Sequence, residues 1–317
     1  MTTYPLPQNL KDLMIVIHDT IEENRFILYG GAPVDLLLDK NSNIHDLDIA
    51  LKGIDETKIE TLRRRIENKG YKITEPYREY FILINERVVL IYAENKEWFL
   101  DIGFLENPEH VGLFDAQSLY FRYPELDYVD NYNALSAIKK KCLTPIRGLA
   151  KENPYLLLAR FLHLCAKYEM SLEDNPNHKS ILLELKMRIK NWKSPNEFGG
   201  PIAYASCLSS ILKSIVRSKD RSVFIGELVK SDVLEDAYPE LNKGLGSVIS
   251  QKHKVIQSIE RIQAKHALVR LIVGNLHGID RGNFRKCLSS LTVRPWDKED
   301  IGIVNFSQGK QATLPIV

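Results

Sequence analysis

The residues of this sequence whose types and spacing could carry chemistry are two aspartates and two glycines: Asp46, Asp48, Gly30 and Gly31. In an extended strand, residues i and i+2 share a face, so both carboxylates would point the same way while Leu47 points into the core. Like charges held together are destabilising unless a cation lies between them. Mg²⁺ prefers such hard oxygen ligands and keeps coordination positions open for substrate phosphates. The spacing therefore predicts that Asp46 and Asp48 hold Mg²⁺.

The glycine pair follows a short apolar run, residues 25–29, which predicts a buried strand whose end lets the backbone approach a ligand closely. A helix is expected to begin directly behind it, because Pro33 fits a first helical turn. The free N–H groups and positive dipole end of such a helix are the usual physical basis of phosphate binding. We therefore expect Gly30 and Gly31 to bind the phosphates of a nucleoside triphosphate.

A third acid lies among apolar residues in the last of three β-rich runs, which short connectors predict to be antiparallel hairpins: Tyr80–Asn85, Val88–Ala93 and Glu97–Phe104. A buried carboxylate without a partner is costly, so Asp101 needs one. If its strand lies beside that of Asp46 and Asp48, Asp101 completes a three-carboxylate metal site. The alternatives are a salt bridge or an edge position for Asp101, and a solvated strand face or turn for the Asp-x-Asp pair.

Gly30 to Leu38, followed by Asp46-Leu47-Asp48, resembles the head domain of the poly(A) polymerase and tRNA nucleotidyltransferase (CCA-adding) family, within the DNA polymerase beta-like nucleotidyltransferases. That family carries Gly-Gly-x-Val-Arg-Asp-x-Leu-Leu and then Asp-x-Asp. Asp35 keeps the aspartate of this motif, whereas Val34 replaces its arginine. The resemblance implies an α+β fold, with a small head containing a mixed or antiparallel sheet and an all-helical body behind it. We expect the nucleotidyltransferase head to span residues 1–110 and the body, which binds nucleotide and acceptor, residues 111–317.

The resemblance continues with fewer matching residues. Asp115 keeps one aspartate of a family segment, and Asn153 stands where tRNA nucleotidyltransferases have the Asp of Glu-Asp-x-x-Arg, a motif whose Asp and Arg pair with the incoming base. Asn153 can still donate and accept hydrogen bonds, but Leu156, at the position of the arginine, cannot. Arg160 lies one helical turn further on the same face and could partly substitute. The resemblance thus implies nucleotide contacts for Asp35, Asp115, Asn153 and Arg160, while the departures argue against a two-base CCA code.

The chain has 317 residues, of which 44% are hydrophobic, so it is long enough for two domains with separate cores. No apolar run approaches the roughly twenty residues that cross a membrane. The start, Met-Thr-Thr-Tyr-Pro, has neither the basic nor the apolar region of a secretion signal, so we expect a cytoplasmic protein. Four scattered cysteines predict reduced thiols and neither a zinc site nor disulfides: Cys142, Cys165, Cys207 and Cys287.

The C-terminal part is basic. Residues 201–317 contain 17 Lys and Arg against 11 Asp and Glu, a net charge of +6, whereas residues 1–200 carry −4. A helix predicted over Lys252–Leu276 bears a basic stripe that could contact RNA through its phosphates, although a plain solvated face is the alternative. For the cluster Arg63-Arg64-Arg65, a solvated helix face is the favoured interpretation. The charge asymmetry is compatible with a polyanionic partner.

Together these patterns predict a nucleotidyltransferase that moves a nucleoside monophosphate from a nucleoside triphosphate to a hydroxyl acceptor, an RNA 3′ end, with pyrophosphate released. Asp46, Asp48 and Asp101 would hold two Mg²⁺ ions. Two alternatives stay open: modification of a protein or small molecule in a toxin or defence system, and an inactive RNA- or nucleotide-binding relative, for which the loss of the family arginine at Val34 is the argument. The acceptor, the preferred nucleotide and the oligomeric state are left open.

Overall fold

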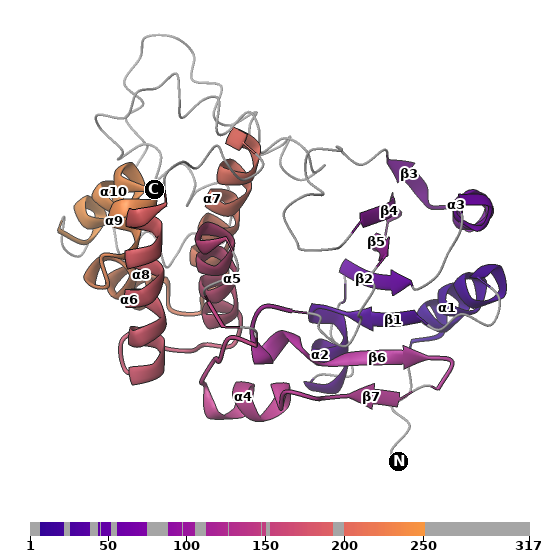
Figure 1. The fold of residues 1–317 in the computed structure, drawn as a ribbon, viewed down its shortest axis with the longest axis horizontal. Helices are drawn as coiled ribbons and strands as arrows, with labels where there is room; N and C mark the ends of the chain where they lie inside the picture. Colours follow the sequence, from indigo (N-terminus) through magenta and orange to yellow (C-terminus); the bar gives the residue numbers. More distant parts are fainter. Residues whose placement is uncertain are drawn as a thin grey trace, which may run out of the picture.

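The computed structural model describes residues 7–21, 26–38, 44, 46–51, 56–74, 88–96, 98–104, 112–125, 127–146, 148–149, 153–192 and 200–250. Its first part is a sheet with helices on both faces, and its second part is a helical body beside that sheet (Figure 1). This arrangement confirms the expected α+β class, a head with a mixed sheet followed by a helical body. The predicted strand Tyr80–Asn85 and helix Lys252–Leu276 lie outside the described residues.

The described strands form one seven-stranded sheet in the order β3-β4-β5-β2-β1-β6-β7. The neighbours β2 and β5 are parallel, and every other neighbouring pair is antiparallel. The strands are β1 (Phe26–Tyr29), β2 (Asp46–Leu51), β3 (Lys72–Thr74), β4 (Val88–Glu94), β5 (Phe99–Phe104), β6 (Tyr120–Tyr123) and β7 (Asp127–Val129).

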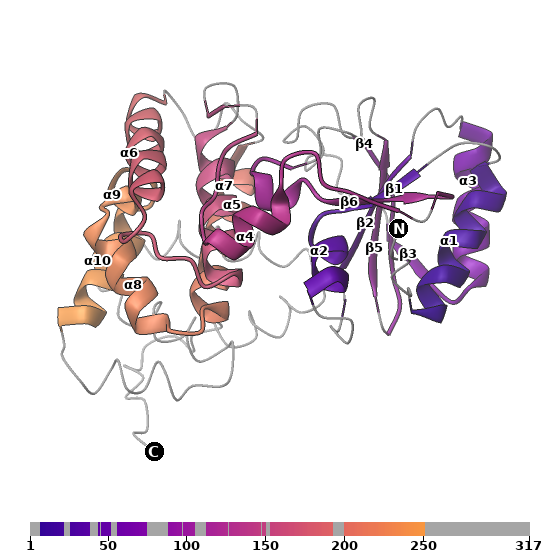
Figure 2. The ribbon, with the colours of Figure 1, turned by 90° about the horizontal axis from the view of Figure 1, so that it is seen from below.

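Helices α1 (Gln8–Ile21) and α3 (Glu56–Asn68) cover one face of the sheet, and α2 (Gly31–Leu38) lies on the other (Figure 2). The sequence dictates this packing, because the buried side chains of α1 recur at the three- and four-residue spacing of one helix face: Leu10, Leu13, Met14, Ile17 and Ile21. They join a core with alternate residues of β2 and β5. The opposite faces of these two strands are therefore left for other side chains.

Strands β6 and β7 extend the sheet beyond residue 110, the predicted end of the head, because β6 pairs with β1 through Phe26 and Tyr123. We propose that the head continues to Val129. Among the described residues, those after it are helical between loops: α4 (Ala134–Lys140), α5 (Pro154–Lys167), α6 (Pro176–Asn191), α7 (Gly200–Arg217), α8 (Arg221–Lys230), α9 (Val233–Ala237) and α10 (Pro239–Ser250). None of the described helices is both long enough and apolar enough to cross a bilayer.

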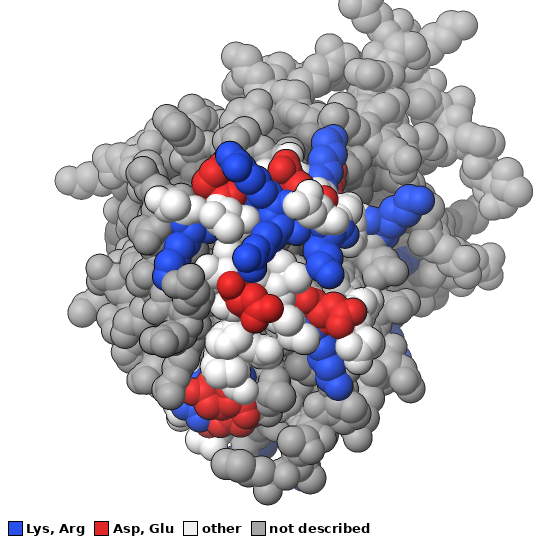
Figure 3. Space-filling model, turned by 90° about the vertical axis from the view of Figure 1, so that its right-hand side faces the viewer, with Lys and Arg blue, Asp and Glu red and all other residues white. Residues whose placement is uncertain are grey.

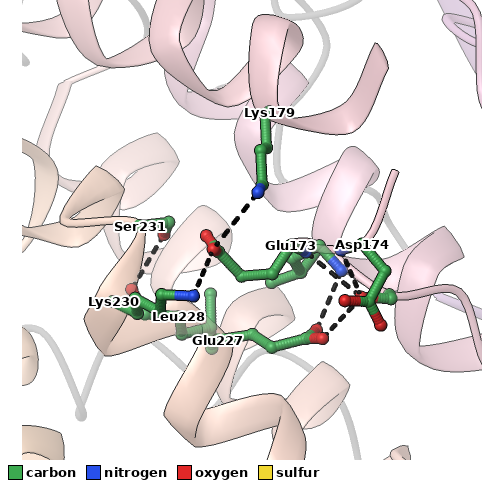
Figure 4. Close-up of polar contacts among 9 residues, drawn as sticks. Glu173, Asp174, Lys179, Glu227, Leu228, Lys230 and Ser231 are labelled. Atoms are coloured by element: carbon green, nitrogen blue, oxygen red, sulfur yellow. Dashed lines mark hydrogen bonds and ion pairs between the residues drawn. The ribbon is translucent and has the colours of Figure 1, made fainter. Parts of the chain in front are cut away.

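A polar clasp ties the loop before α6 to α8 (Figure 4). Glu173 forms ion pairs with Lys230 of α8, at 2.9 Å, and with Lys179 of α6, at 3.8 Å. Glu227 accepts hydrogen bonds from the hydroxyl of Ser171 and the backbone N–H of Leu172. The loop that follows α5 is thereby fixed to the rest of the body, which holds the C-terminal end of α5 in place.

Candidate active site

The three predicted carboxylates lie on one face of the sheet. Strand β2 pairs with β5 in parallel, which meets the condition for a shared site that the two strands be neighbours, and Asp48 lies opposite Asp101. Asp46 is two residues back along β2 and opposite Phe99. Since side chains in register on neighbouring strands share a face, all three aspartates point away from the core of α1 and α3, into which Leu47 and Ile49 point. Asp46 is exposed, whereas Asp48 and Asp101 are half-buried.

A polar row crosses four strands at this level. Tyr29 of β1 pairs with Asp48, and Tyr92 of β4 pairs with Asp101. The row therefore reads Tyr29, Asp48, Asp101 and Tyr92 from β1 to β4, on the face opposite α1 and α3. A row of polar side chains on one side of a buried sheet marks the side where the sheet meets a ligand or solvent instead of core.

The diglycine connects this row to α2. Gly30 directly follows β1 and has a φ of +79°, a conformation that favours glycine, and a Cβ at Gly30 would collide with the carboxylate oxygen Oδ2 of Asp48. Helix α2 begins at Gly31, so its first N–H groups lie at the turn. The sequence pattern predicted this strand, turn and helix, and the structure adds that Gly30 is required by both its conformation and its distance from Asp48.

Lys167 reaches the same turn from the body. Its Nζ lies 2.8 Å from Oδ1 and 2.9 Å from Oδ2 of Asp35, and 3.1 Å from the position that a Cβ on Gly31 would take. Sequence reasoning assigned Asp35 to the site but missed Lys167. A signal existed, because the non-buried residues of α5 recur at helical spacing along an otherwise buried helix: Leu156, Arg160, His163 and Lys167. We call these four residues the α5 stripe.

The α5 stripe is electrostatically positive. Burial lowers the pKa of His163 to about 3, and four nearby cations add to this effect: Arg160, Arg217, Lys167 and Lys213. Two of them belong to α7, which packs against α5. The imidazole is therefore neutral at physiological pH, and the positive charge near the α5 stripe comes from Lys and Arg side chains.

Two other predicted site residues accept hydrogen bonds from backbone N–H groups. The Oδ1 of Asp115 accepts hydrogen bonds from the N–H groups of Ala116 and Thr144, and burial raises its pKa. Asn153 is 6% exposed and caps α5, because its Oδ1 accepts from the N–H groups of Tyr155 and Leu156. The structure thus places both residues at turns of the chain, where their side-chain oxygens have backbone partners.

Arg160 lies half-buried on the α5 stripe, close enough to α7 that its charge opposes the rise in the pKa of Cys207, which burial brings to about 12. Cys142, Cys165 and Cys207 are free thiols, and Cys287 lies outside the described residues.

The structure brings three carboxylates to one face without gathering them into a metal-ready group. Among the described residues, no three His, Cys, Asp or Glu side chains are arranged to hold a metal ion. Asp46 is exposed at the beginning of β2, whereas Asp48 is half-buried and lies against Gly30. The donors still fit Mg²⁺ by type, because the register pair Asp48 and Asp101 supplies carboxylate oxygens from strands that lie about 4.8 Å apart.

No protein-family model matches the sequence, and no curated protein matches it. Among solved structures, the chain is similar to a Thermotoga maritima CCA-adding enzyme complexed with tRNA, with 13% identity and a TM-score of 0.56 over 94% of this chain and 70% of that one. The chain has the fold of the CCA-adding enzymes. A CCA-adding enzyme complexed with ATP gives 12% identity and a TM-score of 0.55 over 94% and 70% of the two chains. A tRNA-processing enzyme gives 14% and 0.54 over 96% and 80%.

This likeness confirms the fold that the diglycine and Asp-x-Asp motifs implied. It spans the head and the body together, whereas the residues that carried the sequence resemblance lie mostly in the head.

The arginine cluster of α3 lies away from the site, on the face that α1 and α3 form. There, Lys and Arg side chains are mixed with Asp and Glu side chains (Figure 3). Arg64 pairs with Glu60 at 3.2 Å while both side chains are more than half exposed, and Arg65 donates to the hydroxyl of Thr20. This geometry agrees with the solvated helix face that the sequence favoured.

Proposed function

We propose that the chain transfers a nucleoside monophosphate from a nucleoside triphosphate to the 3′ hydroxyl of an RNA. One observation carries the proposal: the glycine turn that opens α2 lies directly against Asp48, which is in register with Asp101. The fold supports it, because similar structures include CCA-adding enzymes complexed with ATP, with CTP and with tRNA.

The proposed reaction exchanges one phosphorus–oxygen bond for another. The acceptor oxygen attacks the α-phosphorus, the bond from that phosphorus to the bridging oxygen breaks, pyrophosphate leaves, and the hydroxyl proton passes to solvent water. The N–H groups at Gly30 and Gly31 donate to the phosphates and hold them beside Asp48. Asp48 and Asp101 would hold Mg²⁺, joined by Asp46 through a change of side-chain rotamer. When bound, Mg²⁺ lowers the pKa of the attacking hydroxyl and neutralises the triphosphate.

Nucleotide choice follows from the start of α5. Leu156 offers no polar group to a base, and the Oδ1 of Asn153 is already bonded to the backbone of α5. These two positions therefore lack the paired donors and acceptors that a two-base code needs. We propose that the chain selects one nucleotide, or selects weakly, and that Arg160 is the polar residue of the α5 stripe closest to the base.

The proposal is tested by incubating the full chain with each α-labelled nucleoside triphosphate, Mg²⁺ and either total RNA or total protein. Label is expected on RNA. Asp48→Asn keeps the shape of the side chain but removes a charge, so transfer should fall at least about 100-fold. Asp12→Asn is the matched control, because Asp12 lies on α1 and bonds only to Gln8 within the described residues.

Retained transfer in Asp48→Asn would refute the assignment of Asp48. Label on protein instead of RNA would show that the acceptor is a protein. If RNA is labelled, the lengths of the labelled products would distinguish addition of a single nucleotide from tailing. Removal of Mg²⁺ by a chelator should abolish transfer and be reversed by added Mg²⁺. Failure of all four nucleotides to label any acceptor would overturn the proposed function.

A further inference from the structure

We infer that Lys167, which the body carries, binds the terminal phosphates of the nucleotide at the glycine turn and exchanges its contact with Asp35 for them. The inference rests on the proposed function, because it assigns a residue to the same site. It adds a residue from a second part of the chain, 132 positions away from Asp35 along the sequence.

The two glycines of the turn have different neighbours. A Cβ on Gly30 would meet the carboxylate of Asp48. A Cβ on Gly31 would lie 3.1 Å from the ammonium of Lys167 and 3.7 Å from Oδ2 of Asp35, its partner. A group bonded to the N–H groups of this turn therefore has a carboxylate on one side and a cation on the other. This layout suits a triphosphate that carries a divalent cation, because one part of it approaches carboxylates through the metal while the rest is stabilised by positive charge.

The α2 helix supplies no cation of its own at this point. Val34, next to Asp35, is fully buried in the core that also contains Phe114 and Phe161 of the second part of the chain. Its side chain packs and cannot reach a phosphate. The positive charge beside the turn comes from α5, where Lys167 is the last helical residue.

The charge around Lys167 favours an anion. Arg160 lies on the α5 stripe with it, and Arg217 belongs to the neighbouring α7, which runs beside α5 (Figure 1). Within the described part of the chain, neither Arg160 nor Arg217 takes part in a hydrogen bond or ion pair. Arg160 and Lys167 are half-buried and Arg217 is exposed. Their like charges repel one another, and a phosphate chain relieves that repulsion. Burial is the main cause of the lowered pKa of His163, which lies among these cations, and their positive charges lower it further.

Phosphates can reach Lys167. Its side chain is 27% exposed and that of Asp35 is 32% exposed, so the pair is neither sealed in the core nor fully solvated. At this degree of exposure, an ion pair is worth little, and an anion that makes several contacts can replace the carboxylate. Asp35 then has two effects: it orients the lysine, and its negative charge opposes an incoming phosphate.

The test measures binding of pyrophosphate and of each nucleoside triphosphate to the full chain without an acceptor. Lys167→Ala should weaken both about 10- to 100-fold, the range for loss of a hydrogen bond to a charged group. Lys167→Arg should stay within about fivefold of the original chain, since it keeps the charge. Lys186→Ala is the matched control: Lys186 is also 27% exposed and also pairs with one acid, Glu235, but on α6.

The Asp35→Asn variant distinguishes a phosphate-binding role of Lys167 from a purely structural role of its ion pair with Asp35. The amide still accepts a hydrogen bond from Lys167 but no longer repels phosphate, so pyrophosphate should bind about 3- to 10-fold more tightly. A purely structural pair predicts the same sign for both variants, because Lys167→Ala removes the pair and Asp35→Asn weakens it. Weakening in both Asp35→Asn and Lys167→Ala, or unchanged binding in Lys167→Ala, would overturn the inference, provided that urea unfolding shows both variants folded.

The phosphates that Lys167 binds could also belong to the RNA acceptor, so binding of single-stranded RNA is measured in the absence of nucleotide. If Lys167→Ala lowers RNA affinity and leaves pyrophosphate affinity unchanged, the inference is overturned in favour of the acceptor backbone. The inference and the proposed function fail separately. Triphosphate binding that depends on Lys167, without transfer to any acceptor, would refute only the function. Transfer with an unchanged KM for nucleotide in Lys167→Ala would refute only the role of Lys167.

Discussion

Substitution of Gly30 by alanine tests the contact between the glycine turn and Asp48. Two costs are expected. The φ of +79° is unfavourable for a residue with a Cβ by about 1–2 kcal/mol. The new Cβ also overlaps Oδ2 of Asp48, so the carboxylate must move, and displacements of about 1 Å in a catalytic group commonly cost about 100-fold in rate. Gly30→Ala should therefore lower the free energy of unfolding by about 2–3 kcal/mol and the rate of nucleotide transfer by about 100-fold.

Gly70→Ala is the control, because Gly70 has a similar φ of +87° but open space where its Cβ would lie. Urea unfolding should show a loss of about 1 kcal/mol, and initial rates of nucleotide transfer should be unchanged. In an Asp48→Ala background the overlap disappears, so Gly30→Ala should then cost no more stability than Gly70→Ala. A folded Gly30→Ala chain that transfers nucleotide at the original rate would refute the assigned contact between the turn and Asp48.

Two further predictions concern α5. Asn153→Ala removes the N-cap of the helix and should lower the free energy of unfolding by about 1 kcal/mol in urea, whereas an unchanged value would refute the capping role. Since the folded pKa of His163, about 3, lies below its unfolded value of 6.5, the neutral imidazole adds stability that is fully present above pH 6.5 and is lost as the pH falls towards 3. The titration of His163 should make the free energy of unfolding about 2 kcal/mol lower at pH 5 than at pH 7, and His163→Gln should reduce that difference. An unaltered pH dependence in the variant would contradict it.

Local patterns were sufficient to predict the centre of the head. The apolar run before Gly30, the proline of α2 and the alternation of acidic and apolar residues in β2 each report on adjacent residues. The need of Asp101 for a partner raised the placement of β5 beside β2 as one of several possibilities, and the structure selects it by bringing Asp101 opposite Asp48. The helical body behind the head was implied by the resemblance, and α5, α6, α7, α8 and α10 lie there.

Other features could not be obtained in this way. The pairing of β6 with β1 joins residues almost a hundred positions apart, and nothing in either strand alone specifies its neighbour. Lys167 meets Asp35 only because the body folds against the head. For Asn153 the sequence did indicate the capping role, because Asn followed by Pro is a typical helix start. The resemblance instead assigned Asn153 to a position that pairs with the incoming base.

Helix α2 belongs to two cores at once, and this limits how the molecule can bend. Ala32 and Leu36 pack with the sheet, whereas Val34 packs with residues of the second part of the chain. A hinge between the two parts at α2 would expose Val34, at a cost of about 1.5–3 kcal/mol for a fully buried side chain. Any opening large enough to admit a long acceptor is therefore expected to have its hinge outside α2. The packing of α2 against the sheet and against the second part of the chain is expected to stay unchanged.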